Sequence, residues 1–174
     1  MPGTPRRVAA VLAAVVALAG CGIADTGVLP AGEPARGGLT AGSGDLLRVY
    51  FVTQEGTWPV SRPAPAGDRL QPAMDALLAG PTADERRRGL ATELPRASQR
   101  VRARTADGRV ELRLPWLVRD LRPVAVSQLV CTAAAGAGGA PVIEVYEPGM
   151  TGGPWPVRCD ESGSAVPAGE GGFS

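Results

Sequence analysis

The chain of 174 residues has no histidine and no lysine, so all 18 of its basic residues are arginine. The absence of imidazole excludes Ser-His-Asp and Cys-His catalysis, and also metal sites with histidine ligands. Mechanisms that use carboxylates or arginine stay open. We therefore expect a protein that is not an enzyme and that binds neither a metal nor a cofactor.

Aromatic residues are also scarce, at 4% of the chain against 44% for all hydrophobic residues. Aliphatic side chains and alanine must therefore build most of the core. The acidic residues number 17, so the charge is nearly balanced. It gives no general argument for nucleic acid as a partner, and we expect none. The length suggests one domain once non-globular ends are removed.

The N-terminus has the parts of an export signal. Arg6 and Arg7 make a positive start, and residues 8–19 form an apolar stretch that is short for a membrane-spanning helix. The stretch leads into the tetrapeptide Leu-Ala-Gly-Cys21, which resembles the lipobox of bacterial lipoproteins. The resemblance implies that residues 1–20 are a lipoprotein signal peptide and that Cys21 carries lipid. An ordinary signal peptide with a chance cysteine is the alternative, and both Sec and twin-Arg export stay open.

Two segments that flank the domain are rich in glycine. Residues 21–44 comprise the lipidated cysteine and a flexible Gly/Pro-rich linker, and residues 161–174 are expected to be a disordered tail. The linker has a root-mean-square reach of roughly 25 Å, so a domain of residues 45–160 can stand off the bilayer. We expect the protein to be anchored by lipid on the extracytoplasmic face of the cell membrane.

The remaining cysteines, Cys131 and Cys159, form an even pair. In an oxidising compartment such a pair indicates a structural disulfide. It would close a loop of about 29 residues and stabilise the fold by on the order of 3–4 kcal/mol in the chain-entropy model. A redox or metal-binding pair is the alternative, but there is no C-x-x-C spacing.

The first half of the domain predicts a strand and then two helices. Residues 46–53 are β-rich and apolar, and a Pro-rich loop follows. Apolar residues recur with helical spacing over residues 70–78, and Gly80-Pro81 ends that helix. Thr82 and Glu85 have the spacing of a capping box for a short second helix, with Gly89 as its C-terminal cap.

Asp107-Gly108 predicts a tight hairpin turn. Pairing outward from this turn places six residues on one face, which we expect to be the core face: Thr105, Ala103 and Val101 opposite Val110, Leu112 and Leu114. The other face pairs Arg104 with Glu111 and Arg102 with Arg113. The turn preference of Asp107-Gly108 and the alternation of core-facing and charged residues favour the same register.

A second main helix and a last strand follow. Asp120 can cap the helix, with Pro123 in its first turn, and residues 136–139 end it. Residues 141–147 predict a strand. The order β-α-β-β-α-β favours an α+β fold, in which a small mixed β-sheet has two main helices packed on one face.

Eleven residues between positions 76 and 95 form a pattern: Ala76, Leu77, Leu78, Gly80, Pro81, Thr82, Glu85, Gly89, Leu90, Leu94 and Pro95. This pattern resembles the GerMN domain, a sporulation and spore germination module of bacterial lipoproteins. Gln128-Leu129-Val130 also resembles the second helix of that family, and the likeness runs from about residue 48 to residue 160.

The motif residues also have structural roles, because they break or cap helices. We therefore interpret Gly80, Pro81, Thr82, Glu85, Gly89 and Pro95 as a fold signature. The resemblance implies no catalytic residues.

The outer face of the predicted hairpin is the strongest local charge feature. It gathers five arginines against Glu111: Arg100, Arg102, Arg104, Arg109 and Arg113. One interpretation is a binding face for an anionic wall polymer, lipid headgroups or an acidic partner. The alternative is a solvated sheet face that discourages aggregation.

The three tryptophans, Trp58, Trp116 and Trp155, are expected in Pro-flanked loops. They either close over the ends of the sheet or form a contact platform for carbohydrate or protein.

Together these features predict a lipid-anchored envelope protein with a non-catalytic GerMN-like interaction or assembly module. The resemblance links it to sporulation, germination or envelope maintenance. Its expected partners are the membrane, through the anchor, and another envelope protein or further copies of itself. The alternative function is binding of an anionic wall polymer or lipid headgroups through the arginine face.

Overall fold

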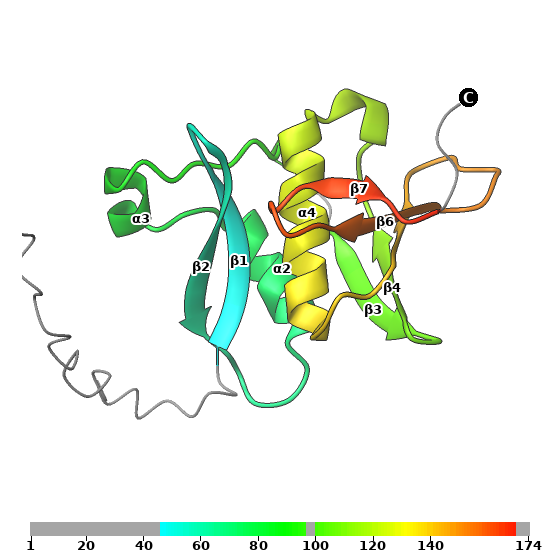
Figure 1. Ribbon diagram of the computed structural model, residues 1–174, viewed down its shortest axis with the longest axis horizontal. Coiled ribbons are helices and arrows are strands. Elements are labelled where there is room, and N and C mark those ends of the chain that lie inside the picture. Colours follow the sequence, from blue (N-terminus) through cyan, green and yellow to red (C-terminus); the bar gives the residue numbers. More distant parts are fainter. Residues whose placement is uncertain (1–45, 97–99, 170–174) are drawn as a thin grey trace, which may run out of the picture. The chain divides into compact units, whose positions relative to one another are not determined.

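Two β-sheets lie on either side of a pair of helices in the computed structural model, which describes residues 46–96 and 100–169 (Figure 1). The first sheet consists of β1 (Leu46–Thr53) and β2 (Gly56–Pro63). The second has five strands in the order β3-β4-β5-β6-β7. The predicted α+β class is confirmed. The predicted signal peptide, lipidated Cys21 and linker lie outside the described residues.

The five-stranded sheet is mixed, as predicted. Its strands are β3 (Arg102–Ala106), β4 (Arg109–Arg113), β5 (Ile143–Tyr146), β6 (Trp155–Cys159) and β7 (Ala165–Pro167). Strands β4 and β5 are parallel, whereas the other neighbouring pairs are antiparallel. The predicted register of the β3–β4 hairpin is confirmed from Arg102 opposite Arg113 to Ala106 opposite Arg109. Thr105, expected on the core face, is exposed because it lies beside the turn.

Strand β2 replaces the Pro-rich loop that we expected after the first strand. It pairs with β1 along its whole length, with Tyr50 opposite Pro59 and Leu46 opposite Pro63. Proline has no N–H and is tolerated on an edge strand, where that position can face away from the neighbour. The two prolines therefore mark β2 as an edge strand.

Helices α2 (Leu70–Leu78) and α4 (Pro123–Ala137) form the layer between the sheets. The predicted apolar face of α2 is confirmed, because Leu70, Ala73, Met74 and Leu77 are buried. The two helices approach closely at Gly136, where an added Cβ would lie 3.0 Å from the Cα of Leu70.

Helix α4 differs from the prediction in two ways. Asp120 belongs to a preceding 3-10 helix (Val118–Asp120), and Arg122 occupies the N-cap position with no side-chain capping bond. Packing on one face of a sheet predicts burial along one side of the helix, but α4 buries eight consecutive residues from Ser127 to Ala134. A helix packed between two sheets is enclosed around its circumference, so it lacks the one-sided pattern of a surface helix.

Polar side chains of the helices form hydrogen bonds with backbone N–H and C=O groups at the edges of the strands. Thr132 Oγ1 accepts a hydrogen bond from the Tyr50 N–H at 3.0 Å, and Gln128 Nε2 donates to the Tyr50 carbonyl at 3.0 Å, both on β1. At the other sheet, Gln71 accepts from the Ala103 N–H at 2.9 Å. Ser127 Oγ accepts from the Ala165 N–H at 3.0 Å. Buried polar groups thus serve as substitutes for missing neighbouring strands.

Strands β6 and β7 and their connection correct the prediction of a tail from residue 161. Residues 161–169 belong to the described fold, and Gly163 is buried against Thr57 of β2. The hydroxyl of Thr57 donates to the Gly163 carbonyl at 2.6 Å. The high content of small residues here reflects a tight turn that contacts the other sheet.

Candidate functional site

The motif between residues 76 and 95 surrounds a buried ion pair that the sequence analysis missed. Arg62 of β2 binds Glu85 of α3 (Ala83–Arg87) through Nε and Nη2, at 3.2 and 2.5 Å. Its other N–H groups donate to the carbonyls of Ala76 and Gly80, and its guanidinium lies 4.9 Å from the centre of the Phe51 ring. Arg62 therefore joins the first sheet to the end of α2 and the start of α3.

Glu85 also completes the predicted capping box, which is confirmed. Its carboxylate accepts from the Thr82 N–H at 2.7 Å, while the Thr82 hydroxyl accepts from the Glu85 N–H at 3.2 Å. Burial of the Glu85 carboxyl raises its pKa. The hydrogen bonds from Arg62 and Thr82, with the charge of Arg62, outweigh burial and leave the pKa below its ordinary value. Three hydrogen bonds from Arg62 and Thr82 hold the carboxylate in its charged form.

The other signature residues end or redirect the chain around this pair. Gly80 and Gly89 have φ of 79° and 86°, in the left-handed region that favours glycine. Gly89 follows the C-cap of α3, as expected from its spacing. Pro81 is buried, whereas Pro95 is exposed, and both line an open groove.

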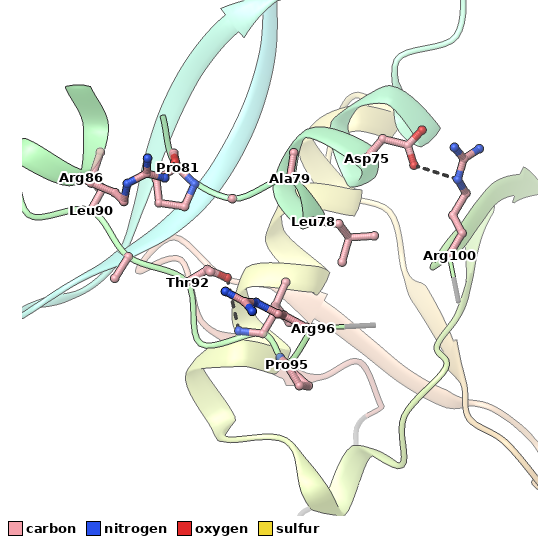
Figure 2. Close-up of a pocket in the computed structure, with 13 residues that line it drawn as sticks. Asp75, Leu78, Ala79, Pro81, Arg86, Leu90, Thr92, Pro95, Arg96 and Arg100 are labelled. Carbon is pink, nitrogen blue, oxygen red and sulfur yellow. Dashed lines mark hydrogen bonds and ion pairs between the residues drawn. The ribbon is translucent and has the colours of Figure 1, made fainter. Parts of the chain in front are cut away.

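An open groove of about 710 Å³ lies between the end of α2, helix α3 and residues 90–96 (Figure 2). Its apolar lining includes Leu78, Leu90 and Leu94, together with the signature prolines Pro81 and Pro95. Three arginines line it as well: Arg86, Arg96 and Arg100. The sequence predicts no site here, because the lining residues come from three separate elements.

The charges in this groove are unequal. Asp75 is its one acidic lining residue, and it lies 3.6 Å from Arg100 Nε while also accepting from Gln71 at 2.9 Å. Arg86 donates to the Pro81 carbonyl. Arg96 has no ion pair within residues 46–96 and 100–169. The groove therefore keeps positive charge beside an apolar floor.

The predicted arginine face is only partly assembled. Arg102, Arg104, Arg109 and Arg113 lie on the exposed face of β3 and β4, but Arg100 lies before β3 and lines the groove instead. The sheet register adds Arg158 of β6 to this face, two residues beyond Pro156, which is opposite Glu144. We call the five strand residues the outer arginine face: Arg102, Arg104, Arg109, Arg113 and Arg158. Arg158 was missed because β6 was not expected.

Acidic neighbours neutralise much of the outer arginine face. Glu111 accepts from Arg104 at 2.9 and 2.6 Å and from Arg113 at 3.3 Å, and Glu144 of β5 accepts from Arg109 at 3.0 Å. The prediction of a nearly unopposed charge is therefore wrong, because the parallel neighbour β5 supplies a second carboxylate. In the described part of the chain, Arg102 and Arg158 have no ion pair.

Tyr146 lies on the same face, at the end of β5 and opposite Arg113. The guanidinium of Arg113 lies 4.5 Å from the centre of its ring. Desolvation, followed by the charges of Glu144 and Glu111, raises the pKa of the phenol above its ordinary value. Tyr146 therefore stays a neutral aromatic surface for arginine.

Two of the three tryptophans are on strands, which corrects the expectation of loops. Trp58 lies on β2 and Trp155 on β6, with 59% and 54% of each residue exposed. Trp116 is in the connection after β4 and is half-buried beside the core. Trp58 and Trp155 leave most of their indole surface open to contact.

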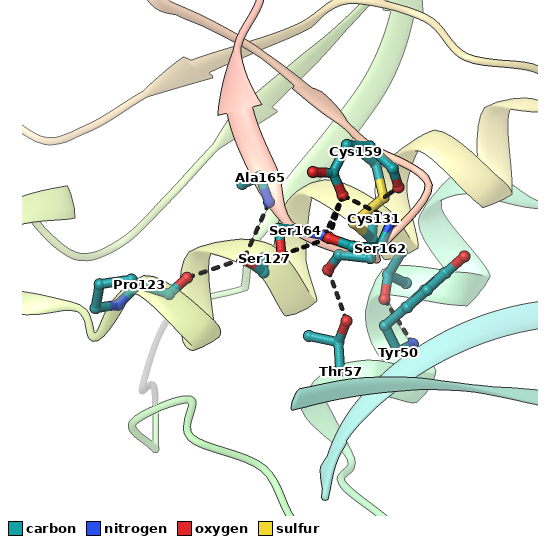
Figure 3. The surroundings of a disulfide bond; sticks show 12 residues. Tyr50, Thr57, Pro123, Ser127, Cys131, Cys159, Ser162, Ser164 and Ala165 are labelled. Atoms are coloured by element: carbon teal, nitrogen blue, oxygen red, sulfur yellow. Dashed lines mark hydrogen bonds between the residues drawn. A yellow bond between two sulfur atoms is a disulfide. The ribbon is translucent and has the colours of Figure 1, made fainter. Parts of the chain in front are cut away.

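Cys131 of α4 and Cys159 of β6 form the predicted disulfide (Figure 3). It fixes the central helix to the five-stranded sheet. Asp160 follows directly and accepts from the Ser162 hydroxyl at 2.7 Å and from the N–H groups of Ser162 and Ser164. These bonds lower the pKa of Asp160, and the bond from the Ser162 hydroxyl has the largest effect. The Asp160 carboxylate thus holds the β6–β7 turn.

Within residues 46–96 and 100–169, no three His, Cys, Asp or Glu residues come together as metal ligands would. No helix among these residues is long and apolar enough to cross a membrane.

Comparisons with models of protein families, with curated proteins and with solved structures found no match for this chain. The resemblance to the GerMN domain stays a prediction from the motif.

Proposed function

We propose that this chain is a lipid-anchored protein on the extracytoplasmic face of the cell membrane. Its GerMN-like domain is a non-catalytic module that binds another envelope protein or assembles with copies of itself. The link to sporulation, germination or maintenance of the envelope is part of this proposal and rests on the resemblance of the motif to the GerMN domain.

One observation supports this function most directly. The polar groups of the signature segment are used inside the fold, where Glu85 is held by Arg62 and Thr82, while the outer side of the same segment lines an open groove. A catalytic site needs an acid, base or nucleophile that faces its substrate. A binding module needs an accessible surface on a rigid support, which this segment offers.

The Cys131–Cys159 disulfide supports the proposed location. Disulfides persist in oxidising compartments outside the cytosol, and this one joins two elements of the core. Export by the predicted signal peptide would deliver the chain to such a compartment.

Anchoring is tested by metabolic labelling with an alkyne fatty acid and by membrane fractionation. The wild-type chain should be labelled and sediment with membranes, whereas Cys21→Ser should be unlabelled and soluble. Cys131→Ser serves as the control, because it removes a thiol without touching the lipobox. Equal labelling of wild type and Cys21→Ser would refute the anchor.

Binding is tested by photo-crosslinking in living cells, with a benzophenone side chain at Leu94 in the groove, at Trp155, or at Arg87 as an exposed control outside the groove. A discrete protein adduct at Leu94 or Trp155, and none at Arg87, would support the module. Its identity would separate a foreign partner from self-assembly. Identical patterns at all three positions would contradict specific binding.

A second function is favoured by Arg102 and Arg158 of the outer arginine face. Neither forms an ion pair with any described residue. They could bind an anionic wall polymer or lipid headgroups. Purified unlipidated Cys21→Ser protein should then sediment with cell-wall fragments or anionic vesicles. Adding Arg102→Glu and Arg158→Glu should abolish this, while Arg87→Glu with Arg119→Glu, the matched control, should not.

A further inference from the structure

The groove of Figure 2 has an apolar floor that suits aliphatic side chains. Leu90 is buried, and Leu78 and Leu94 are half-buried along its walls. A sugar or phosphate polymer has few aliphatic groups. If it covered the leucines, their contact with water would be replaced by contact with polar groups, which is not favourable. A peptide with Leu, Val or Ile side chains would bury them.

The arginines of the groove determine which charge a bound ligand should carry. Asp75 already has two partners, Arg100 and Gln71, and Arg86 is oriented by its bond to the Pro81 carbonyl. Arg96 has no ion pair among the described residues and lies in the middle of the view, beside Thr92 (Figure 2). A planar guanidinium binds a carboxylate through two parallel N–H···O bonds. Charge complementarity therefore selects carboxylates next to the apolar floor.

The groove is also built on a stable support. Helix α2 provides one wall with Asp75 and Leu78, and its buried apolar face fixes that wall to the core. The Arg62–Glu85 pair holds the junction of α2 with α3. Residues 90–96 are fixed by the pairing of Ala91 with Val52 and by the bond from the Glu93 N–H to Gln128 at 2.9 Å. The walls are therefore held in place before a ligand arrives, which lowers the entropic cost of binding.

We infer that this groove binds an extended acidic segment of a partner envelope protein, with aliphatic side chains on Leu78, Leu90 and Leu94 and a carboxylate on Arg96. This deepens the proposed function as an interaction module and rests on it. Arg86 and Arg100 flank the bound segment and disfavour basic sequences by like-charge repulsion.

The test uses the lipidated full chain in nanodiscs and a fluorescent probe peptide, acetyl-Gly-Leu-Glu-Leu-Glu-Leu-Gly-amide, with a photoreactive leucine. Fluorescence anisotropy should show saturable binding that weakens with added salt. The same peptide with lysine in place of glutamate should not bind. Mass spectrometry of the photo-adduct should locate it on residues 78–96.

Substitutions then assign the contact. Arg96→Glu should weaken binding of the probe by about tenfold or more, because it removes a charge-assisted pair and adds repulsion. Arg119→Glu, an equal charge change at an exposed position outside the groove, should leave the affinity within about twofold. Circular dichroism melting curves of both variants should match the wild type, since both side chains are exposed.

Four results would overturn the inference: no binding of the glutamate peptide at about 1 mM, equal binding of the lysine peptide, adducts outside the groove, or equal competition by inorganic phosphate. The last would show a general anion surface. If the peptide fails while crosslinks from Trp155 in cells still capture a discrete partner, the groove inference falls and the proposed function stands. If both fail, the proposed function falls too.

Discussion

Arg62 donates two hydrogen bonds to the carboxylate of Glu85, and both side chains are largely removed from solvent, at 18% and 6% exposure. The pair links a strand of one sheet to the helix that follows the signature glycine. Its geometry explains why the signature combines helix-breaking residues with a glutamate. The glutamate must reach both its own helix start and an arginine from a distant strand.

Replacing Arg62 should therefore destabilise the whole domain. Arg62→Leu leaves the Glu85 carboxylate with the Thr82 N–H as its remaining donor and removes the arginine donor of two carbonyls, so it should lower the free energy of unfolding by about 3 kcal/mol. Arg87→Leu is the matched control, because its pair with Asp84 is about three-quarters exposed on both sides. That change should cost less than about 1 kcal/mol. Urea denaturation measures both, and equal losses would contradict a structural role for Arg62.

The same pair predicts a dependence on pH. The pKa of Glu85 is lower in the folded chain than its ordinary value of 4.5. Its contribution to stability is then fully present above about pH 4.5 and is lost as the pH falls through the folded pKa. The stability difference between wild type and Glu85→Gln should shrink as urea titrations move from pH 7 toward pH 3. A constant difference across this range would show that Glu85 is not held as a carboxylate.

The disulfide is expected to contribute stability mainly through the unfolded chain. It closes a loop with a sequence separation of 28. Replacing both Cys131 and Cys159 with alanine should therefore cost about 3 kcal/mol. Reduction of the wild type with dithiothreitol should produce a similar loss, and should leave the double variant unchanged. An effect of the reductant on the double variant would show that it acts elsewhere.

Gln128 gives a sharper test of how helix α4 supports the fold. It is fully buried, donates to the Tyr50 carbonyl and accepts from the Glu93 N–H. Gln128→Leu would leave both backbone groups buried without partners, at a cost of about 2 kcal/mol. Gln54→Leu, in the exposed turn between β1 and β2, should be nearly neutral. Hydrogen exchange should quicken at Glu93 in the first variant and not in the second.

Local chemistry predicted those parts of the fold in which neighbours in sequence determine the structure. The Asp107-Gly108 turn and the alternation beside it fixed one hairpin, and Thr82 with Glu85 fixed the start of α3. Strand β2 was missed because prolines weaken a strand pattern, and an edge position is visible only once its neighbour is known. Strand β7 was missed because it is three residues long and depends on β6 and on Ser127 for its partners.

The candidate sites show the same limit. Four arginines were grouped correctly on β3 and β4, but the counter-ion of Arg109 comes from β5. Arg100 lies before β3 and pairs with Asp75 of α2, which only the fold brings near. The groove could not be predicted, because Leu78, Arg86 and Arg96 lie on three elements with no shared period. Arg62 lies in a segment that was expected to be a loop, so nothing in the sequence indicated its pairing with Glu85. Long-range pairing therefore decided which charges stayed available for binding.

Helices α2 and α4 approach each other closely at Gly136, so a side chain there should separate them. A Cβ at Gly136 would lie 3.0 Å from the Cα of Leu70 and 3.3 Å from the Cβ of Ala73, both on α2. Neither atom can move without shifting the helix, so Gly136→Ala should force α2 and α4 apart and cost about 1–3 kcal/mol despite the better helix propensity of alanine. Gly152→Ala is the control, because a Cβ there meets nothing within 4 Å. Thermal unfolding should separate the two variants, and a Gly136→Ala chain as stable as wild type would mean that the helices pack less closely than described.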